Sequence, residues 1–246
     1  MVLLFALAAF ASTTLAVKPI HSHNDYLQAV PFWDAFNLSI MSVEADVWWQ
    51  DSQLFVAHTS DAIVKTRTLD SLYLENIMGL INGSIPSATP FVLPLLIDMK
   101  SDGPTTFQPV WNALQPLRTA GHLTTYANGI LTQGAVTVVG TGNTPLASVV
   151  ALDPRDVFFD SDIRHLYSTL PSVGVTPQWG PEISPLSSVD YSDVSNTAQM
   201  QALVLNAHDF KIRSRFWGHR RQHRHVEHLL GGRLGLGERG RSAGRE

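Results

Sequence analysis

The sequence predicts an α/β fold, a TIM-type (β/α)8 barrel in which parallel strands alternate with helices. Short apolar runs alternate along the chain with longer segments whose apolar residues recur at helical spacing. This alternation is typical of a parallel sheet. Polar side chains follow the apolar runs, as they do at the C-terminal strand ends of such barrels. With 246 residues, 44% of them hydrophobic, the chain is long enough for one large domain.

The first expected elements are strand 19–23 and helix 29–37. Strands 42–47 and 54–58 come next, and Gln50-Asp51-Ser52 between them is too short for a helix, so we predict a hairpin. The remaining elements follow in chain order: helix 69–81, strand 92–99, helix 109–120, strands 135–139, 157–159 and 181–184, helix 197–207 and strand 211–217. Without the hairpin, about seven βα units remain, which is close to an eightfold barrel.

The charge is unevenly distributed along the chain. Residues 1–210 contain 7 Lys and Arg against 18 Asp and Glu, whereas residues 211–246 contain 10 against 3. An acidic body binds nucleic acid poorly because phosphate contacts need clustered cations, so we expect no nucleic-acid partner. The absence of cysteine excludes disulfides, zinc–thiolate sites and thiol nucleophiles. We expect a monomeric, cation-dependent enzyme with a small substrate.

The N-terminal residues 1–16 form an apolar run that ends in small side chains, which is typical of a secretory signal peptide. The run is shorter than the roughly 20 residues of a transmembrane helix. It lacks the usual positive charge, which leaves an N-terminal anchor as the alternative. Sequons begin at Asn37 and Asn82 and are candidate glycosylation sites if the chain is secreted or enters the lumen of the secretory pathway.

Three carboxylates are candidate metal ligands. Glu44 and Asp46 are two residues apart, so on a strand they point to the same face, where they repel each other unless a cation lies between them. Asp98 follows a run of apolar residues and offers a third carboxylate at another strand end. Hard divalent cations such as Mg²⁺ or Ca²⁺ prefer oxygen ligands of this kind. The alternatives are a solvent-facing Glu44 and Asp46, and a simple ion pair between Asp98 and Lys100.

Three histidines are candidate acids and bases. Phosphodiester cleavage needs a base for the attacking hydroxyl and an acid for the leaving oxygen, and histidine can serve as either near neutral pH. His21, His23 and His58 each lie at a predicted strand end near the carboxylates. Lys100 could offset charge on a substrate phosphate. A lone histidine is more often structural than catalytic, but three histidines near three carboxylates favour a catalytic role.

The motifs His21-Ser-His-Asn-Asp-Tyr26, Ser42-Val-Glu-Ala-Asp-Val47, Leu54-Phe-Val-Ala-His58 and Ile97-Asp-Met-Lys100 resemble the fungal altered inheritance of mitochondria protein 6 family. That family belongs with the phospholipase C-like phosphodiesterases, which include glycerophosphodiester phosphodiesterases and spider-type phospholipase D toxins. The resemblance covers residues 17–217. It implies a phosphoric diester hydrolase on a TIM barrel, with a glycerophosphodiester or lysophospholipid-like substrate and transient contact with a membrane surface.

The resemblance also implies roles for individual residues. Glu44, Asp46 and Asp98 match the superfamily's ligands for Mg²⁺ or Ca²⁺, and His58 matches its second catalytic histidine. His21 forms the His-x-x-Asn spacing of the toxin branch together with Asn24, and His23 is the alternative first catalytic histidine. The remaining matches are to substrate-binding positions: Asn24, Asp25 and Lys100.

The residues after Gly218 depart from the family pattern. We divide the chain into a signal peptide (1–16), a barrel (17–218) and a basic tail (219–246) that lacks apolar periodicity and is predicted to be disordered, without a strand. Our hypothesis is that a reading-frame shift or an unspliced intron near Gly218 has replaced the native end, so that the last βα unit of the barrel is missing. A spliced transcript that encodes these same residues would contradict it.

Two other functions remain open at this point. In amidohydrolase-like and polymerase-and-histidinol-phosphatase-like hydrolases, a His-x-His pair on the first strand ligates zinc or a related metal. His21 and His23 have that spacing. A truncated, inactive relative that acts as a binding protein is the second alternative, because a fold alone does not establish an activity.

Overall fold

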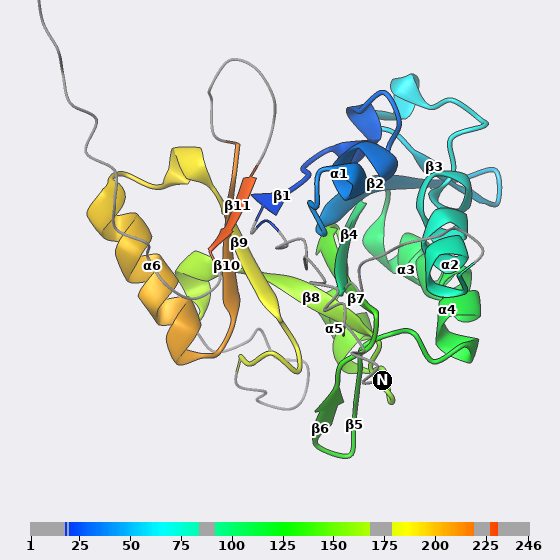
Figure 1. The fold of residues 1–246 in the computed structure, drawn as a ribbon. Helices are drawn as coiled ribbons and strands as arrows, with labels where there is room; N and C mark the ends of the chain where they lie inside the picture. Colours follow the sequence, from blue (N-terminus) through cyan, green and yellow to red (C-terminus); the bar gives the residue numbers. More distant parts are fainter. Residues whose placement is uncertain (1–17, 19, 84–91, 168–178, 219–226, 231–246) are drawn as a thin grey trace, which may run out of the picture.

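The computed structural model shows a mixed α/β fold built around one nine-stranded sheet (Figure 1). The structure describes residues 18, 20–83, 92–167, 179–218 and 227–230. The strand order is β1-β11-β10-β9-β8-β7-β4-β2-β3. The sheet is mostly parallel, which confirms the predicted fold class, and closure into a (β/α)8 barrel stays a prediction.

The parallel part of the sheet contains the site. Its strands are β2 (Val43–Gln50), β4 (Leu93–Met99), β7 (Val136–Gly142), β8 (Val157–Asp162), β9 (Leu186–Asp190) and β10 (Arg213–Trp217). In β4 every residue except Asp98 is buried. Continuous burial is typical of parallel strands covered on both faces. The exception is the carboxylate expected at the strand end.

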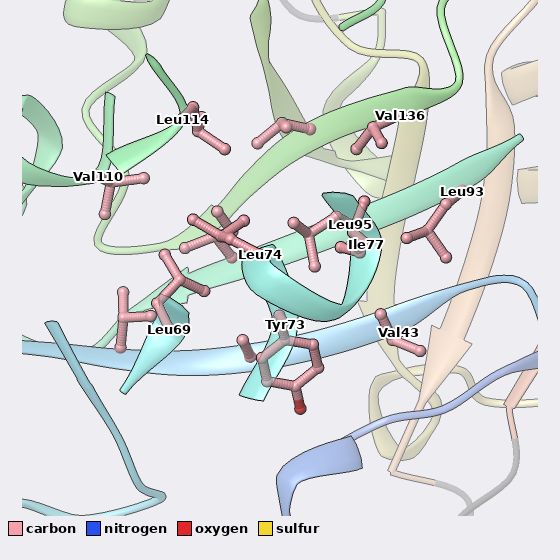
Figure 2. Close-up of a cluster of buried hydrophobic side chains, with 14 of the residues drawn as sticks. Val43, Leu69, Tyr73, Leu74, Ile77, Leu93, Leu95, Val110, Leu114 and Val136 are labelled. Carbon is pink, nitrogen blue, oxygen red and sulfur yellow. The ribbon is translucent and has the colours of Figure 1, made fainter. Parts of the chain in front are cut away.

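Helices connect the parallel strands. They are α1 (Trp33–Asn37), α2 (Glu75–Ile81), α3 (Gly103–Ala113), α4 (Gln115–Thr119), α5 (Leu146–Val150) and α6 (Thr197–Asp209). A π-helical turn at Asp70–Leu74 leads into α2. Figure 2 shows Tyr73 and Ile77 from this region packed over β2 and β4. Each such buried apolar side chain stabilises the fold by about 1.5–3 kcal/mol.

The helix expected at 109–120 begins earlier and is interrupted. α3 begins at Gly103 because the Asp102 carboxylate caps it, accepting a hydrogen bond of 3.0 Å from the Thr105 backbone N–H. Pro116 then lies in the first turn of α4, where a missing backbone N–H is tolerated. Local capping therefore determines these boundaries.

Two hairpins leave the main course of the chain. The predicted hairpin is confirmed: β2 pairs antiparallel with β3 (Gln53–Val56), and Asp51 and Ser52 in the turn have φ values of 50° and 59°. A second hairpin, which was not predicted, is formed by β5 (Thr125–Ala127) and β6 (Ile130–Thr132). Its turn is Asn128-Gly129, and this dipeptide is a strong hairpin signal.

The prediction of a strand at 181–184 was wrong. The backbone N–H groups of Ile183 and Ser184 both donate to Gly180 O, which makes this segment a turn. β9 follows at Leu186–Asp190. Two of its five residues are serines, so it lacks the apolar pattern from which strands were predicted. Ser187 is nevertheless buried, because its hydroxyl donates to Ser161 O at 2.9 Å.

The tail also contains a strand, which contradicts our prediction that it has none. β11 (Glu227–Leu230) lies between β10 and β1 (Ile20–His21) and pairs antiparallel with both. It occupies a position where the edges of β10 and β1 would otherwise leave backbone groups unpaired. Two isolated parallel bridges, Lys18–Ile40 and Ser22–Val43, also join the region of β1 to the start of β2.

Some predictions cannot be compared with the structure. The candidate signal peptide, residues 1–16, lies outside the described residues, as does most of the tail. Asn37 ends α1 and is exposed, which is compatible with a glycosylation site. In the described part of the chain, no helix is both long and apolar enough to cross a membrane.

Candidate active site

The three predicted carboxylates meet across two adjacent strands. Asp98 lies at the C-terminal end of β4 as predicted, whereas Glu44 and Asp46 lie in the first half of β2, because that strand continues to Gln50 in the hairpin with β3. Glu44 and Asp46 lie on β2, and the parallel register places Asp46 beside Asp98 of β4. One oxygen from each of the three carboxylates lies within 4.8 Å of the other two. Strand alternation brings Glu44 and Asp46 to one face, and the sheet brings Asp98 to them.

This cluster fits a hard divalent cation. Asp46 Oδ1 and Asp98 Oδ1 are buried and have no hydrogen-bond partner in the part of the chain that the structure describes. A buried carboxylate oxygen without a partner is costly, and a cation with oxygen ligands removes that cost. Burial raises the pKa of Asp98, and so does the neighbouring Asp46, against the lowering effect of Lys100. Glu44, Asp46 and Asp98 could therefore hold Mg²⁺ or Ca²⁺.

Lys100 bridges two of the carboxylates. Its Nζ lies 2.6 Å from Asp98 Oδ2 and 3.0 Å from Asp46 Oδ2. Burial alone would lower the pKa of Lys100, but the two carboxylates raise it, so the ammonium stays charged. The ion pair considered as an alternative is thus present. It leaves the Oδ1 atoms of both aspartates for a metal.

A buried arginine, which the sequence analysis did not single out, neutralises Glu44. Arg215 Nη2 on β10 donates to Glu44 Oε2 at 2.7 Å, and both side chains are almost fully buried. Burial would raise the pKa of Glu44, but Arg215, His21 and His23 hold it below its usual range. Glu44 is therefore ionised. The sequence signal for this residue was an arginine inside a predicted strand, 211–217.

The two histidines near β1 both face Glu44. His21 is completely buried, with Nδ1 2.7 Å from Ser42 Oγ and Nε2 3.1 Å from Glu44 Oε2. His23 Nε2 lies 3.7 Å from the same Glu44 oxygen, and its side chain is 18% exposed. Both ring nitrogens of His21 are thus engaged within the protein. Of the two, His23 is the one that reaches solvent.

His58 lies on the other side of the cluster. Its Nδ1 is 3.2 Å from Asp46 Oδ2 and 3.1 Å from the Tyr26 hydroxyl, and its side chain is 57% exposed. Tyr26 OH donates to Asp46 Oδ2 at 2.7 Å, and burial together with Asp46 raises the pKa of Tyr26 far above its usual value. Tyr26, another residue not predicted, therefore stays protonated and helps to orient the Asp46–His58 pair.

The remaining predicted residues shape the loop after β1. Asp25 is buried and accepts hydrogen bonds from Ser22 Oγ, the Phe32 backbone N–H and the Tyr73 hydroxyl. These contacts favour a structural role over the predicted substrate contact. Asn24 precedes Asp25 with a positive φ of 49°, which turns the chain away from the strand end.

Gly142 at the end of β7 supports Asp98. Its φ is +63°, and a Cβ there would clash with Asp98 Oδ1. We expect Gly142→Ala to displace Asp98, to lower the free energy of unfolding by about 1–3 kcal/mol, and to weaken Mg²⁺ binding. Urea unfolding and isothermal titration calorimetry measure the two effects.

Gly121→Ala is the matched control for this substitution. Gly121 has a similar φ of +71°, but a Cβ there would meet nothing within 4 Å. It carries the same backbone cost without the contact to Asp98. Equal Mg²⁺ affinity in the two variants would show that Gly142 does not position the carboxylate.

Sequence comparisons add independent information. A family model described as AIM6-like phosphodiesterase domain matches residues 10–92 and 81–160. The chain is 34% identical over 227 residues to the altered inheritance of mitochondria protein 6 homolog of Arthroderma benhamiae. The alignment covers 81% of this chain and 72% of the Arthroderma protein.

More distant relatives carry the same name. The Saccharomyces cerevisiae protein is 24% identical over 239 residues, and the Candida glabrata protein is 28% identical over 254 residues. Both alignments cover 81% of this chain, which spans less than two thirds of these proteins (61% and 62%). No solved structure matches the chain significantly.

Proposed function

Because the chain belongs to the AIM6-like phosphodiesterase family, we propose that it is a metal-dependent phosphoric diester hydrolase with two-histidine acid/base catalysis. The observation that carries the proposal is the convergence of three carboxylates within 4.8 Å, two of them with buried oxygens that lack hydrogen-bond partners among the described residues. The proposed substrate is a glycerophosphodiester or a lysophospholipid. Closure of the sheet into a (β/α)8 barrel is part of the proposal, supported by the bridges between the regions of β1 and β2.

Each residue has a proposed task. Glu44, Asp46 and Asp98 would hold a divalent cation, which would supply Lewis-acid polarisation of the phosphoryl oxygens. Lys100 adds positive charge beside it. His21, with both ring nitrogens occupied, positions Glu44.

His23 and His58 share the proton transfers. One histidine accepts the proton of the attacking hydroxyl while the hydroxyl oxygen forms a bond to phosphorus. The other histidine protonates the leaving oxygen while the original phosphorus–oxygen bond breaks. Attack by water yields a hydrolysed diester, and attack by a substrate hydroxyl yields a cyclic phosphate. The Asp46 carboxylate at Nδ1 orients His58 for this transfer.

A metal titration coupled to a panel of glycerophosphodiesters and lysophospholipids tests the proposal. We expect activity that depends on Mg²⁺ or Ca²⁺. His23→Ala and His58→Ala should each lower kcat/KM by about 10²–10⁴-fold, the usual contribution of a positioned acid or base. His122→Ala is the control, since His122 lies before β5, away from the cluster.

Two results would count against the proposal. Full activity in His58→Ala would remove the histidine from the mechanism. Activity that requires zinc or iron would support the amidohydrolase-like alternative instead. Among the described residues, the only cluster of potential ligands consists of carboxylates and includes neither His21 nor His23. That composition favours the first function.

A further inference from the structure

A pocket of about 200 Å³ lies beside the carboxylate cluster, at the C-terminal ends of β7 to β10. Two contacts connect it to the site. Its Trp217 ring meets His23 edge-on with 6.0 Å between centroids. Its Asp160 Oδ2 lies 3.9 Å from Nη1 of Arg215, the residue that binds Glu44. A diester whose phosphorus lies at the carboxylates could therefore place one alcohol substituent in this pocket.

The pocket wall carries an excess of negative charge. Four aspartates line it against one arginine: Asp160, Asp162, Asp190, Asp193 and Arg164. Arg164 already binds Asp162 at 2.6 Å and Asp193 at 2.8 Å. An anionic substituent would be repelled here, and a cationic one would be attracted.

Two buried polar atoms in the wall point to a ligand that donates hydrogen bonds. Asp160 Oδ1 and Ser188 Oγ are buried, and neither makes a hydrogen bond of normal geometry within the described ranges, although Ser188 and Thr141 both lie near enough to Asp160 to lower its pKa. The Asp160 side chain is only 3% exposed. Burial raises its pKa to about 7. The pocket thus offers two acceptors that no described residue satisfies with normal hydrogen-bond geometry.

We propose that this pocket binds the primary ammonium group of an amino-alcohol substituent, an inference that rests on the proposed phosphodiesterase function. An ammonium N–H can donate to Asp160 Oδ1 and Ser188 Oγ while its charge offsets the acidic wall. The Trp217 ring provides an aromatic surface that attracts a cation. A quaternary ammonium has no N–H to donate, and a neutral polyol leaves the charge uncompensated. Ethanolamine is therefore favoured over choline and glycerol.

Titration of the full chain with ethanolamine, choline and glycerol tests this inference directly. NMR measures the binding. We expect ethanolamine to bind at least about tenfold more tightly than choline or glycerol, because one charge-assisted hydrogen bond changes affinity by about that factor. Asp160→Asn should weaken ethanolamine binding by about tenfold and Ser188→Ala by about threefold. Equal binding of glycerol, or unchanged binding in both variants, would overturn it.

Two variants guard against trivial explanations. Asp209→Asn removes the same charge from an exposed position that contacts Tyr167 and does not line the pocket, so ethanolamine binding should be unchanged. Ser188→Ala removes a buried hydroxyl without a hydrogen-bond partner in the described structure, so it should fold as stably as the parent. Loss of binding in Asp209→Asn as well would show a nonspecific charge effect and contradict the site.

Hydrolysis assays separate this inference from the proposed function. The substrates are glycerophosphoethanolamine and glycerophosphocholine, each with Mg²⁺. Asp160-dependent ethanolamine binding without turnover of any diester would support the pocket and refute the phosphodiesterase. Turnover without ethanolamine binding and without preference between the two diesters would refute the pocket and leave the phosphodiesterase standing.

Discussion

Arg215→Met is expected to destabilise the folded protein by about 3–5 kcal/mol, the usual cost of removing one partner from a buried ion pair. Arg215 and Glu44 are 2.7 Å apart, and their side chains are only 2% and 3% exposed. Methionine fills much of the same volume but leaves Glu44 as a buried carboxylate whose remaining neighbours are histidines. Urea unfolding at pH 7 measures the loss.

The pH dependence identifies the buried carboxylates beside Arg215 as the cause: Glu44 at 2.7 Å and, more weakly, Asp160 at 3.9 Å. The pKa of Glu44 is lowered in the folded protein, so its pairing stabilises the fold fully above its unfolded pKa of about 4.3. That stability is lost as the pH falls through the lowered folded pKa. In Arg215→Met, burial instead raises the pKa of Glu44. As the pH falls, Glu44 is therefore protonated in the folded variant before it is protonated in the parent, and this removes the cost of the buried charge from the variant. The stability difference between parent and variant should therefore shrink as the pH falls from 7 to 4.

Arg213→Met is the control for this experiment. Arg213 is an exposed residue two positions earlier in β10. Removing it takes away the same charge from the same strand without touching Glu44. A stability loss in Arg213→Met equal to that in Arg215→Met would contradict the argument, as would a difference that does not change with pH.

If the proposed function is correct, Asp46→Asn is expected to reduce metal-dependent phosphodiesterase activity by about 10³-fold or more, because one carboxylate would then serve both a metal site and a histidine. Asp46 Oδ2 contacts the Tyr26 hydroxyl at 2.7 Å, Lys100 Nζ at 3.0 Å and His58 Nδ1 at 3.2 Å. Its Oδ1 is a candidate metal ligand. Asparagine keeps the shape but removes the charge that both functions need.

Metal binding distinguishes this effect from unfolding. Mg²⁺ that binds only the folded parent raises its melting temperature, and Asp46→Asn should lose that shift. The variant should remain folded, since Lys100 still neutralises Asp98 at 2.6 Å. Asp51→Asn is the control: it lies in the β2–β3 turn with a φ of 50°, which asparagine tolerates. A melting-temperature shift that persists in Asp46→Asn would exclude Asp46 as a ligand.

Much of the site could be predicted because its signals are local. Glu44 and Asp46 share a face as a consequence of strand geometry alone. His23 and His58 follow short apolar runs, and the turn at Asp51-Ser52 is too short for anything but a hairpin. The strand at Leu186–Asp190 could not be found in this way, because hydrogen bonds to neighbouring strands, and not apolar side chains, allow its serines to be buried.

The proposed assignment of His23 rather than His21 to proton transfer rests on the folded structure. Both residues have the same type and nearly the same position in the sequence, so no local pattern separates them. Burial and partners do: Ser42 and Glu44 occupy His21, and only His23 reaches solvent. The same applies to Lys100, whose two carboxylate partners come from different strands.

The sequence by itself determined the α/β class and the chemical inventory of this protein: three carboxylates and three histidines near one another in the pattern of strands, without cysteine. Only the tertiary structure decided how these groups act on one another. Arg215 reaches Glu44 across 171 residues of chain, and β11 pairs with β10 and β1 although its sequence shows no strand pattern. The physical reason is that burial and charge pairing depend on distance in space, which strand periodicity does not encode.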